Sequence, residues 1–176
     1  MNVLFAASEV APFAKTGGLA DVAGSLPQAL AGLGHDIRVV LPRYHCVDPQ
    51  RFGLEHVATF FVPLATWKER CDVLAGRLGP RVTAYFIHKD IYFDRPELYR
   101  TSRGDYPDNA ERFIFFSRAV PELSRVLGFA PDIVHCNDWQ TGLVPLYLKK
   151  FYHGDALLGK ARSVFTIHNL GYQGIF

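Results

Sequence analysis

The chain has 176 residues, of which 49% are hydrophobic and 20% are charged, and its formal net charge is +2. This length favours one globular domain with a real core and is too short for two large domains. The small net charge, without a stripe of basic residues, argues against a protein that binds nucleic acid or a membrane surface.

The N-terminus and the cysteines indicate the compartment. Met1 leads directly into the apolar run "NVLFAASEV", with no basic region before it and no cleavage-like segment after it, which predicts a first strand and no signal peptide. No apolar run approaches the roughly 18 residues of a membrane span. Cys46, Cys71 and Cys136 are odd in number and form no CxxC pair. They predict reduced thiols in a cytoplasmic protein, and neither a disulfide framework nor a zinc site.

The first half of the chain predicts a strand, a helix, a second strand and a meander. The apolar run Val3–Ser8 predicts the first strand. The helix should present an apolar face formed by Leu19, Val22, Leu26, Leu30 and Leu33. This face ends at Gly34, and Pro27 inside it should kink the helix or tighten its early part. Ile37–Leu41 predicts the second strand, and residues 54–78 predict an inserted β-meander.

The middle of the chain predicts a strand, a long loop and a second helix. Val82–Ile87 predicts the strand. The stretch Lys89–Tyr106 lacks a clean period, and its charges and tyrosines favour a functional loop over a disordered one. A helix should begin near Asp108, with Glu111 completing a pair that resembles a capping box. Its apolar face is formed by Phe113, Phe116, Val120 and Leu123. Pro121 should break this helix in two.

The last part of the chain completes an α/β pattern. Asp132–Cys136 and Ser163–Ile167 predict strands, and a helix from about Thr141 to Phe151 separates them. The predicted strands are almost continuously apolar, which is typical of parallel strands covered on both faces. The pattern therefore predicts a doubly wound, mostly parallel α/β sheet. Because no helix follows the last strand, we expect the chain to be a fragment.

The connection between the first strand and the first helix is either a tight corner or an anion site. It reads "EVAPFAKTGGLADV" and places Lys15, Gly17 and Gly18 before the helix. Glycines permit positive φ and let backbone N–H groups approach a phosphate closely. The helix adds the positive end of its dipole, about half a charge, and Lys15 adds a mobile cation. These residues alone leave both readings open.

Two further polar clusters favour a binding site. Asp138 follows the strand "DIVHC", and His168 with Asn169 follows the strand "SVFTI". In a doubly wound sheet the carboxyl ends of these strands lie at the same edge as Lys15, where ligands bind. Each cluster also has a purely structural explanation. Asp138 could cap the next helix, His168 could be a buried imidazole, and Asp21 could favour the first turn of its helix.

A nicotinamide- or flavin-binding Rossmann domain is the rival interpretation. It requires GxGxxG, whereas this loop has only the adjacent pair Gly17 and Gly18. It also requires an acidic residue at the end of the second strand, where this chain has "VVLPRY". Both differences argue against it.

Three motifs together resemble one enzyme family. "KTGGLADV", "HCNDWQTGLVP" and "VFTIHNLGYQGIF" are similar to segments of the ADP-glucose-dependent glycogen and starch synthases of bacteria and plastids. The resemblance extends over the whole chain. It implies a GT-B enzyme in which two Rossmann-like domains face a cleft. Residues 1–176 would be the N-terminal catalytic domain, incomplete and without the second domain.

The resemblance also implies roles for the first cluster. Lys15 would contact ADP-glucose, and the glycine pair would form the pyrophosphate loop, with the backbone contact at Gly18. Asp21 would lie beside the glucosyl or acceptor pocket, and Tyr99 of "RPELYR" near the nucleotide or acceptor site. Gly17 belongs to the same loop.

The resemblance assigns a second set of residues to the surroundings of the transferred sugar. Asp138 and His168 resemble the family's essential polar residues there, and Asn169 would bind the substrate. Gln140 stands where other members often have histidine. The partners would be ADP-glucose, an α-1,4-glucan such as glycogen or starch, and the missing C-terminal domain. No nucleic acid, membrane, cofactor or metal is expected.

The implied reaction transfers glucose with retention to the non-reducing end of the glucan. Its transition state is oxocarbenium-like, and the leaving ADP gains negative charge, so fixed dipoles and cations would do most of the work. No pair of acids is marked out for a two-carboxylate mechanism. The alternative, which the missing second domain keeps open, is a non-catalytic glucan- or nucleotide-binding remnant of such an enzyme.

Overall fold

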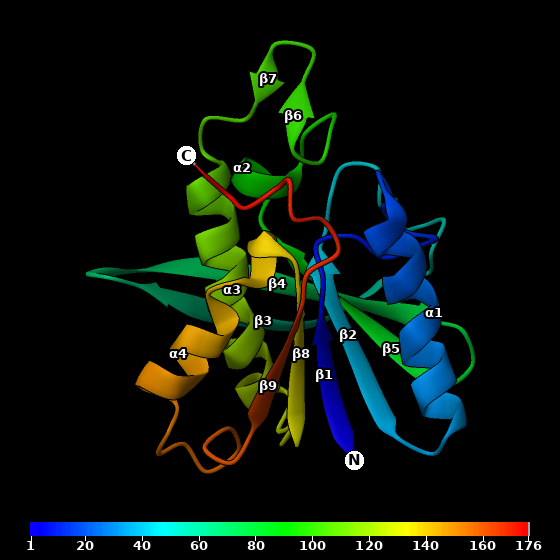
Figure 1. Ribbon diagram of the computed structural model, residues 1–176, viewed down its shortest axis with the longest axis vertical. Helices are drawn as coiled ribbons and strands as arrows, with labels where there is room; N and C mark the ends of the chain where they lie inside the picture. Colours follow the sequence, from blue (N-terminus) through cyan, green and yellow to red (C-terminus); the bar gives the residue numbers. More distant parts are fainter. Residues whose placement is uncertain (176) are drawn as a thin grey trace.

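A seven-stranded sheet forms the centre of the computed structural model, which describes residues 1–175 (Figure 1). Phe176, the last residue of the predicted domain, lies outside the described residues. The strands are β1 (Asn2–Ala6), β2 (Asp36–Pro42), β3 (Glu55–Leu64), β4 (Trp67–Leu78), β5 (Val82–His88), β6 (Arg100–Thr101), β7 (Gly104–Asp105), β8 (Ile133–Asn137) and β9 (Arg162–Thr166). The helices are α1 (Gly18–Gly32), α2 (Asp90–Phe93), α3 (Asn109–Val126) and α4 (Val144–Phe151), with a 3₁₀ turn at Trp139–Thr141.

The order of the strands confirms the doubly wound prediction. The strand order of the sheet is β3-β4-β5-β2-β1-β8-β9. The five neighbouring strands β5, β2, β1, β8 and β9 are parallel. The predicted meander is the hairpin β3–β4, which extends the sheet antiparallel to β5. From the central strand β1 the chain first winds outward to β2 and β5, and it then returns to β8 on the other side. The chain therefore reverses its direction of winding between β1 and β8.

The helices cover the two faces of this sheet. Right-handed crossovers should place α1 on one face of the sheet and α3 with α4 on the other. In Figure 1, α1 lies to the right and α3 and α4 lie to the left. Parallel strands covered on both faces should be apolar throughout, and the inner strands are. Their fully buried side chains include Leu4, Phe5, Val39, Val40, Phe86 and Ile87.

The predicted apolar face of α1 is wrong in part. Leu19 is buried, but Val22 and Leu33 are 37% and 74% exposed. The buried face instead carries small side chains, namely Ala20, Ala23, Gly24, Pro27 and Ala31. A helix that packs this closely needs small residues at the contact, which a count of leucines does not reveal. The helix also continues through Pro27, whose ring is buried.

Gly24 gives a test of this close packing. A Cβ added at Gly24 would lie 2.5 Å from the carbonyl oxygen of Ala11. Because the obstacle is backbone, we expect Gly24→Ala to lower the free energy of unfolding by about 1–3 kcal/mol. In the same helix, a Cβ at Gly32 would meet nothing within 4 Å. Gly32→Ala should be neutral or stabilise by up to about 1 kcal/mol. Urea unfolding measures both, and equal effects would contradict the close contact.

The second helix prediction was right about packing and wrong about its caps. Phe113, Phe116, Val120 and Leu123 are all buried. Pro121 does not break the helix, because α3 is continuous from Asn109 to Val126. The capping box is also absent, since Asp108 makes no side-chain cap bond. Its carboxylate pairs with Arg95 instead, and Glu111 accepts a hydrogen bond from the Tyr92 hydroxyl at 2.5 Å.

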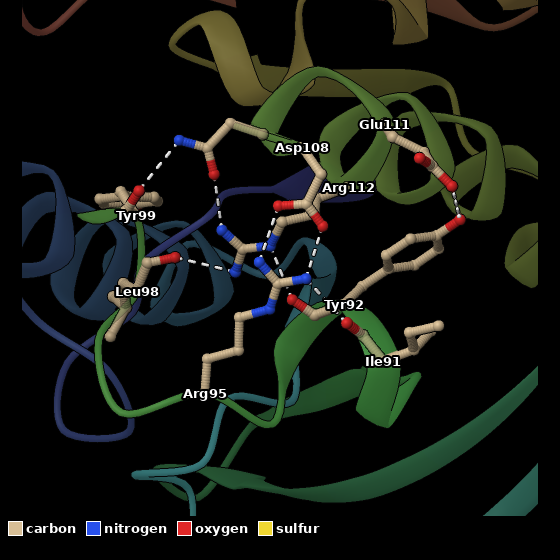
Figure 2. A network of polar contacts seen from close by, with 9 residues as sticks. Ile91, Tyr92, Arg95, Leu98, Tyr99, Asp108, Glu111 and Arg112 are labelled. Carbon is tan, nitrogen blue, oxygen red and sulfur yellow. Dashed lines mark hydrogen bonds and ion pairs between the residues drawn. The ribbon is translucent and has the colours of Figure 1, made fainter. Parts of the chain in front are cut away.

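The predicted loop Lys89–Tyr106 is an ordered insert. It contains α2 and the small hairpin β6–β7, which projects above the sheet (Figure 1). Figure 2 shows that Arg112 of α3 holds its base. The buried Arg112 guanidinium donates to the carbonyl oxygens of Tyr92 at 2.6 Å and Leu98 at 2.9 Å. Burial lowers the pKa of Arg112 from its ordinary value.

The last strand differs from the other parallel strands. β9 is at the edge of the sheet, and Val164 and Phe165 are each 43% exposed although they point to opposite faces. Both faces of β9 are therefore open in the described chain. Within residues 1–175, no helix is both long enough and apolar enough to cross a bilayer.

Candidate active site at the switch point of the sheet

The three polar clusters predicted from the sequence all follow parallel strands at one edge of the sheet. The loop with Lys15 follows β1, Asp138 follows β8, and His168 follows β9, and these three strands are neighbours. β1 and β8 are the strands between which the winding reverses. A doubly wound sheet opens its ligand crevice at this point.

In the first cluster, Lys15 and Asp21 pair with each other. The Lys15 Nζ atom lies 2.6 and 2.8 Å from the two carboxylate oxygens of Asp21. Their side chains are 53% and 59% exposed. An ion pair this exposed contributes only about 0–1 kcal/mol to stability, so an incoming anion can displace it at small cost.

The glycine pair is not explained by backbone strain. Gly17 has φ −147° and ψ −165°, and Gly18 is also outside the positive-φ region, so the expected use of positive φ is wrong. A Cβ at either position would meet nothing within 4 Å. The N-cap residue Gly17 makes no side-chain cap bond to the first turn of α1. The fold itself would accept a side chain here, and the glycines leave the uncapped helix end open.

Asp138 is held in a strained backbone conformation. Its φ of 57° and ψ of 179° lie in a region that is almost reserved for glycine and costs about 1–3 kcal/mol. Its N–H donates to the Thr166 carbonyl oxygen at 2.9 Å, and its Oδ1 accepts from the His168 N–H at 2.7 Å. The side chain makes no cap bond to the following turn, so the capping explanation is wrong.

His168 is half-buried, and a fixed partner orients its ring. Its Nε2 lies 2.9 Å from Oδ1 of Asn137, whose Nδ2 donates to the Ala6 carbonyl oxygen at 3.0 Å. Because the Asn137 oxygen must accept, the neutral imidazole carries its proton on Nε2. The Nδ1 lone pair is then available at the rim. Burial, as the larger cause, and the nearby His168 lower the pKa of His135 from its ordinary value.

A cleft of about 560 Å³ lies beside Asp138. Asp138 and Asn169 line it, together with Trp139 and the α3 residues Phe113 and Ser117. The segment after β9 forms its other wall and runs toward the start of α3 (Figure 1). The structure thus brings two predicted site residues into one cleft, and Lys15 is not among its lining residues.

Tyr99 contacts the first cluster through a residue that the sequence analysis missed. The Tyr99 hydroxyl lies 2.8 Å from both Ser8 Oγ and Glu9 Oε1. Burial raises the pKa of Tyr99 well above its ordinary value, with smaller contributions from Tyr44 and Glu9. Glu9 is only 4% exposed, although it lies between the first strand and the lysine loop. A single acidic residue within the apolar stretch that follows the first strand was the sequence signal that could have identified Glu9.

Metal ligands do not gather at this site. Across residues 1–175, no three histidine, cysteine, aspartate or glutamate side chains are placed so that they could hold a metal ion.

A mostly parallel, Rossmann-like sheet with polar residues at its switch point is the architecture of one half of a GT-B glycosyltransferase. A solved structure agrees with this class. The catalytic domain of starch synthase IV from Arabidopsis thaliana, described as bound to ADP and acarbose, matches with a TM-score of 0.86 and 36% identity. The match covers 98% of this chain and 34% of that chain. A sucrose-phosphate synthase from Thermosynechococcus elongatus, 15% identical with a TM-score of 0.54, shares the fold.

The chain belongs to the family of starch synthase catalytic domains, whose model matches residues 2–176. It is 51% identical to a glycogen synthase of Syntrophotalea carbinolica and 49% identical to glycogen synthase 1 of Geobacter sulfurreducens. Both alignments cover 100% of this chain and 36% of the relative. The chain therefore spans about a third of the length of these relatives. The family predicted from the three motifs is confirmed.

Proposed function

We propose that this chain is the N-terminal catalytic domain of a retaining glucosyltransferase that extends an α-1,4-glucan at its non-reducing end from ADP-glucose. A second Rossmann-like domain, supplied by the rest of the protein, would close the cleft over the rim. The family membership supports this proposal, as does the likeness to a starch synthase structure described with ADP and acarbose bound.

The observation that carries the proposal is the open backbone at Gly17 and Gly18. Neither glycine is needed for its φ angle or for packing, so the space above them is free for a ligand. An uncapped helix start and the Lys15 ammonium both favour a negative charge in that space. A diphosphate fits this combination. Displacement of Lys15 from Asp21 would then leave Asp21 free to face the sugar.

Asp138, His168 and Asn169 would surround the glucosyl group. Asp138 and Asn169 line the cleft and would supply a carboxylate and an amide. His168 does not line it, and its imidazole would reach the sugar from the neighbouring rim. These groups would orient sugar hydroxyls and stabilise the positively charged ring of the transition state. We assign neither Asp138 nor His168 as a covalent nucleophile. Tyr99 would act near the nucleotide or acceptor, through its hydrogen bond to Glu9.

The proposal is tested by transfer of labelled glucose from ADP-glucose to glycogen. The enzyme should have the length of the relatives and carry this chain as its N-terminal part. Incorporation that extends outer chains and retains the α configuration supports the proposal. A stable, folded enzyme that binds glucan or nucleotide without any transfer would favour the non-catalytic alternative.

Lys15→Ala is expected to lower kcat/KM for ADP-glucose in that enzyme by about 10- to 100-fold, because a charge-assisted hydrogen bond contributes about 1.5–3 kcal/mol. The exposed Lys160 is the matched control, and Lys160→Ala should leave kcat/KM unchanged. Initial-rate kinetics with circular dichroism as a folding check measure the effect. A Lys15→Ala enzyme with wild-type kcat/KM would remove this loop from the donor site.

A further inference from the structure

Glu9 is a buried residue whose carboxylate binds the lysine loop, the segment from Lys15 to Gly18, through Thr16 and Gly17. It is 4% exposed, and its Oε1 accepts from the Thr16 hydroxyl at 2.7 Å. Its Oε2 accepts from the backbone N–H groups of Gly17 at 3.2 Å and of Thr16. Two of the loop's amides therefore point inward to a carboxylate. They are not available to a phosphate, so the donors left for an anion begin at Gly18.

Tyr99 extends this arrangement to the ordered insert. Its hydroxyl lies 2.8 Å from Glu9 Oε1, and the two residues are 90 positions apart. The backbone of Tyr99 is fixed in turn, since Asn109 Nδ2 donates to its carbonyl oxygen at 2.9 Å. Arg112 donates to the neighbouring Leu98 carbonyl oxygen (Figure 2). The insert between β5 and α3 thus ends in a rigid contact with the loop after β1.

A buried carboxylate with this many donors is costly to build unless its position matters. Burial of an isolated charge is strongly unfavourable, and here four donor groups compensate for it. The same carboxylate would repel a diphosphate if it faced the crevice. Its oxygens instead face the loop backbone and the Tyr99 hydroxyl, and hydrogen bonds behind the loop stabilise the carboxylate.

We propose that Glu9 and Tyr99 are positioning residues of the donor site, which hold the backbone from Lys15 to Gly18 so that its open side faces the crevice. Neither residue touches the donor. This inference rests on the proposed function, because it assigns ADP-glucose to the crevice. It also makes the insert Lys89–Tyr106 a determinant of donor binding.

The chain offers a matched control of the same chemistry. The Tyr152 hydroxyl donates to Glu122 Oε1 at 2.6 Å, and both residues are buried. Glu122 lies near the end of α3, and Tyr152 directly follows α4. Because crossover helices run back against the strands, this pair lies toward the opposite edge of the sheet. Loss of the hydrogen bond between Tyr152 and Glu122 should therefore leave the lysine loop unchanged.

The first measurement is backbone hydrogen exchange at Thr16 and Gly17, which needs no activity. Glu9→Gln keeps the size of the side chain but replaces the charged carboxylate by a neutral amide. Its oxygen is a weaker acceptor, so both amides should exchange at least about tenfold faster. Tyr99→Phe should give a smaller increase, and Tyr152→Phe should give none. Unchanged exchange at both amides in Glu9→Gln would overturn the inference.

The second measurement is steady-state kinetics in the enzyme of full length. Glu9→Gln should raise KM for ADP-glucose about tenfold and leave KM for glycogen within about twofold, because only the donor loop is disturbed. Tyr99→Phe should show the same pattern more weakly and keeps the test available if Glu9→Gln fails to fold. Tyr152→Phe should change neither KM.

The outcomes separate the two proposals. A wild-type enzyme without transfer would overturn the proposed function and with it the donor-site role, whereas hydrogen exchange would still report whether Glu9 holds the loop. An active wild type whose Glu9→Gln and Tyr99→Phe variants keep the wild-type KM for ADP-glucose would overturn the inference alone. An equal rise of both KM values would indicate general loosening of the fold and would also overturn it.

Discussion

Asp138→Ala is expected to lower kcat of the full-length enzyme by about 10²-fold or more, the loss typical when a preorganised electrostatic group is removed. KM for ADP-glucose should change much less. Asp138 lines the cleft, and we propose that its carboxylate interacts with the sugar ring as positive charge develops there. An interaction made mainly in the transition state appears in kcat and not in substrate binding.

The backbone strain at Asp138 allows activity to be separated from stability. Asp138→Gly removes the carboxylate and its bond from the His168 N–H but accommodates φ 57° without strain. These effects oppose each other, so the free energy of unfolding should change by less than about 1 kcal/mol, whereas Asp138→Ala should be less stable. The kcat of Asp138→Gly should nevertheless be as low as that of Asp138→Ala. Asp138→Ala, in contrast, keeps the strain. If Asp138→Gly is both stable and fully active, the carboxylate has no catalytic role and the strain is unrelated to function.

His168→Ala should reduce kcat in the same direction, and it supplies a second check on the cluster. The substitution removes the Nε2 bond to Asn137 and leaves the backbone bond from the His168 N–H to Asp138 in place. The Asp138 carboxylate therefore keeps its anchor. Thermal unfolding recorded with the kinetics shows whether the loss is catalytic. A variant that only melts earlier, with normal kcat below its melting temperature, would support the buried-imidazole explanation.

The fold was predictable where hydrophobicity alone decides the structure. Five parallel strands followed from continuous apolar runs, because strands covered on both faces have no polar side. Four of the five are covered in this way, whereas β9 has the apolar run but is open on both faces in the described chain. The buried face of α1 was not predictable in this way, since Gly24 and its alanine neighbours are selected by close packing on Ala11 and not by hydrophobicity. The capping box at Asp108 failed for a related reason. Arg95, thirteen positions away, competes for the same carboxylate.

The edge of the sheet that carries the site was predictable, and its internal contacts were not. Parallel topology alone places the residues after β1, β8 and β9 on one rim. The role of Glu9 depends on Tyr99, which is 90 positions away, and no local pattern signals a contact across an insert. The strained backbone of Asp138 likewise occurs together with a bond of its N–H to Thr166, on a different strand. Such contacts appear only when the chain is folded.

Residues 1–176 alone should not elongate glycogen from ADP-glucose. Transfer requires donor and acceptor to be held together with water excluded, which needs a closed cleft. In this chain the side chains of Lys15 and Asp21 are more than half exposed. In water a contact between unit charges at 4 Å contributes about 1 kcal/mol, against several in a closed site. ADP-glucose should therefore bind weakly, and added salt should weaken it further.

The same openness predicts self-association of the isolated chain. Val164 and Phe165 of β9 and the following Ile167 are 43%, 43% and 55% exposed. Among residues 1–175, no strand pairs with the outer edge of β9. Exposed apolar surface beside a free edge favours contacts between copies. Sedimentation should show concentration-dependent oligomers, and labelled glucose should not enter glycogen. Adding the remaining part of a full-length synthase as a separate polypeptide should restore some transfer. Turnover by residues 1–176 near that of the full-length enzyme would instead mean that one domain completes the site, because no second wall would then be needed to exclude water.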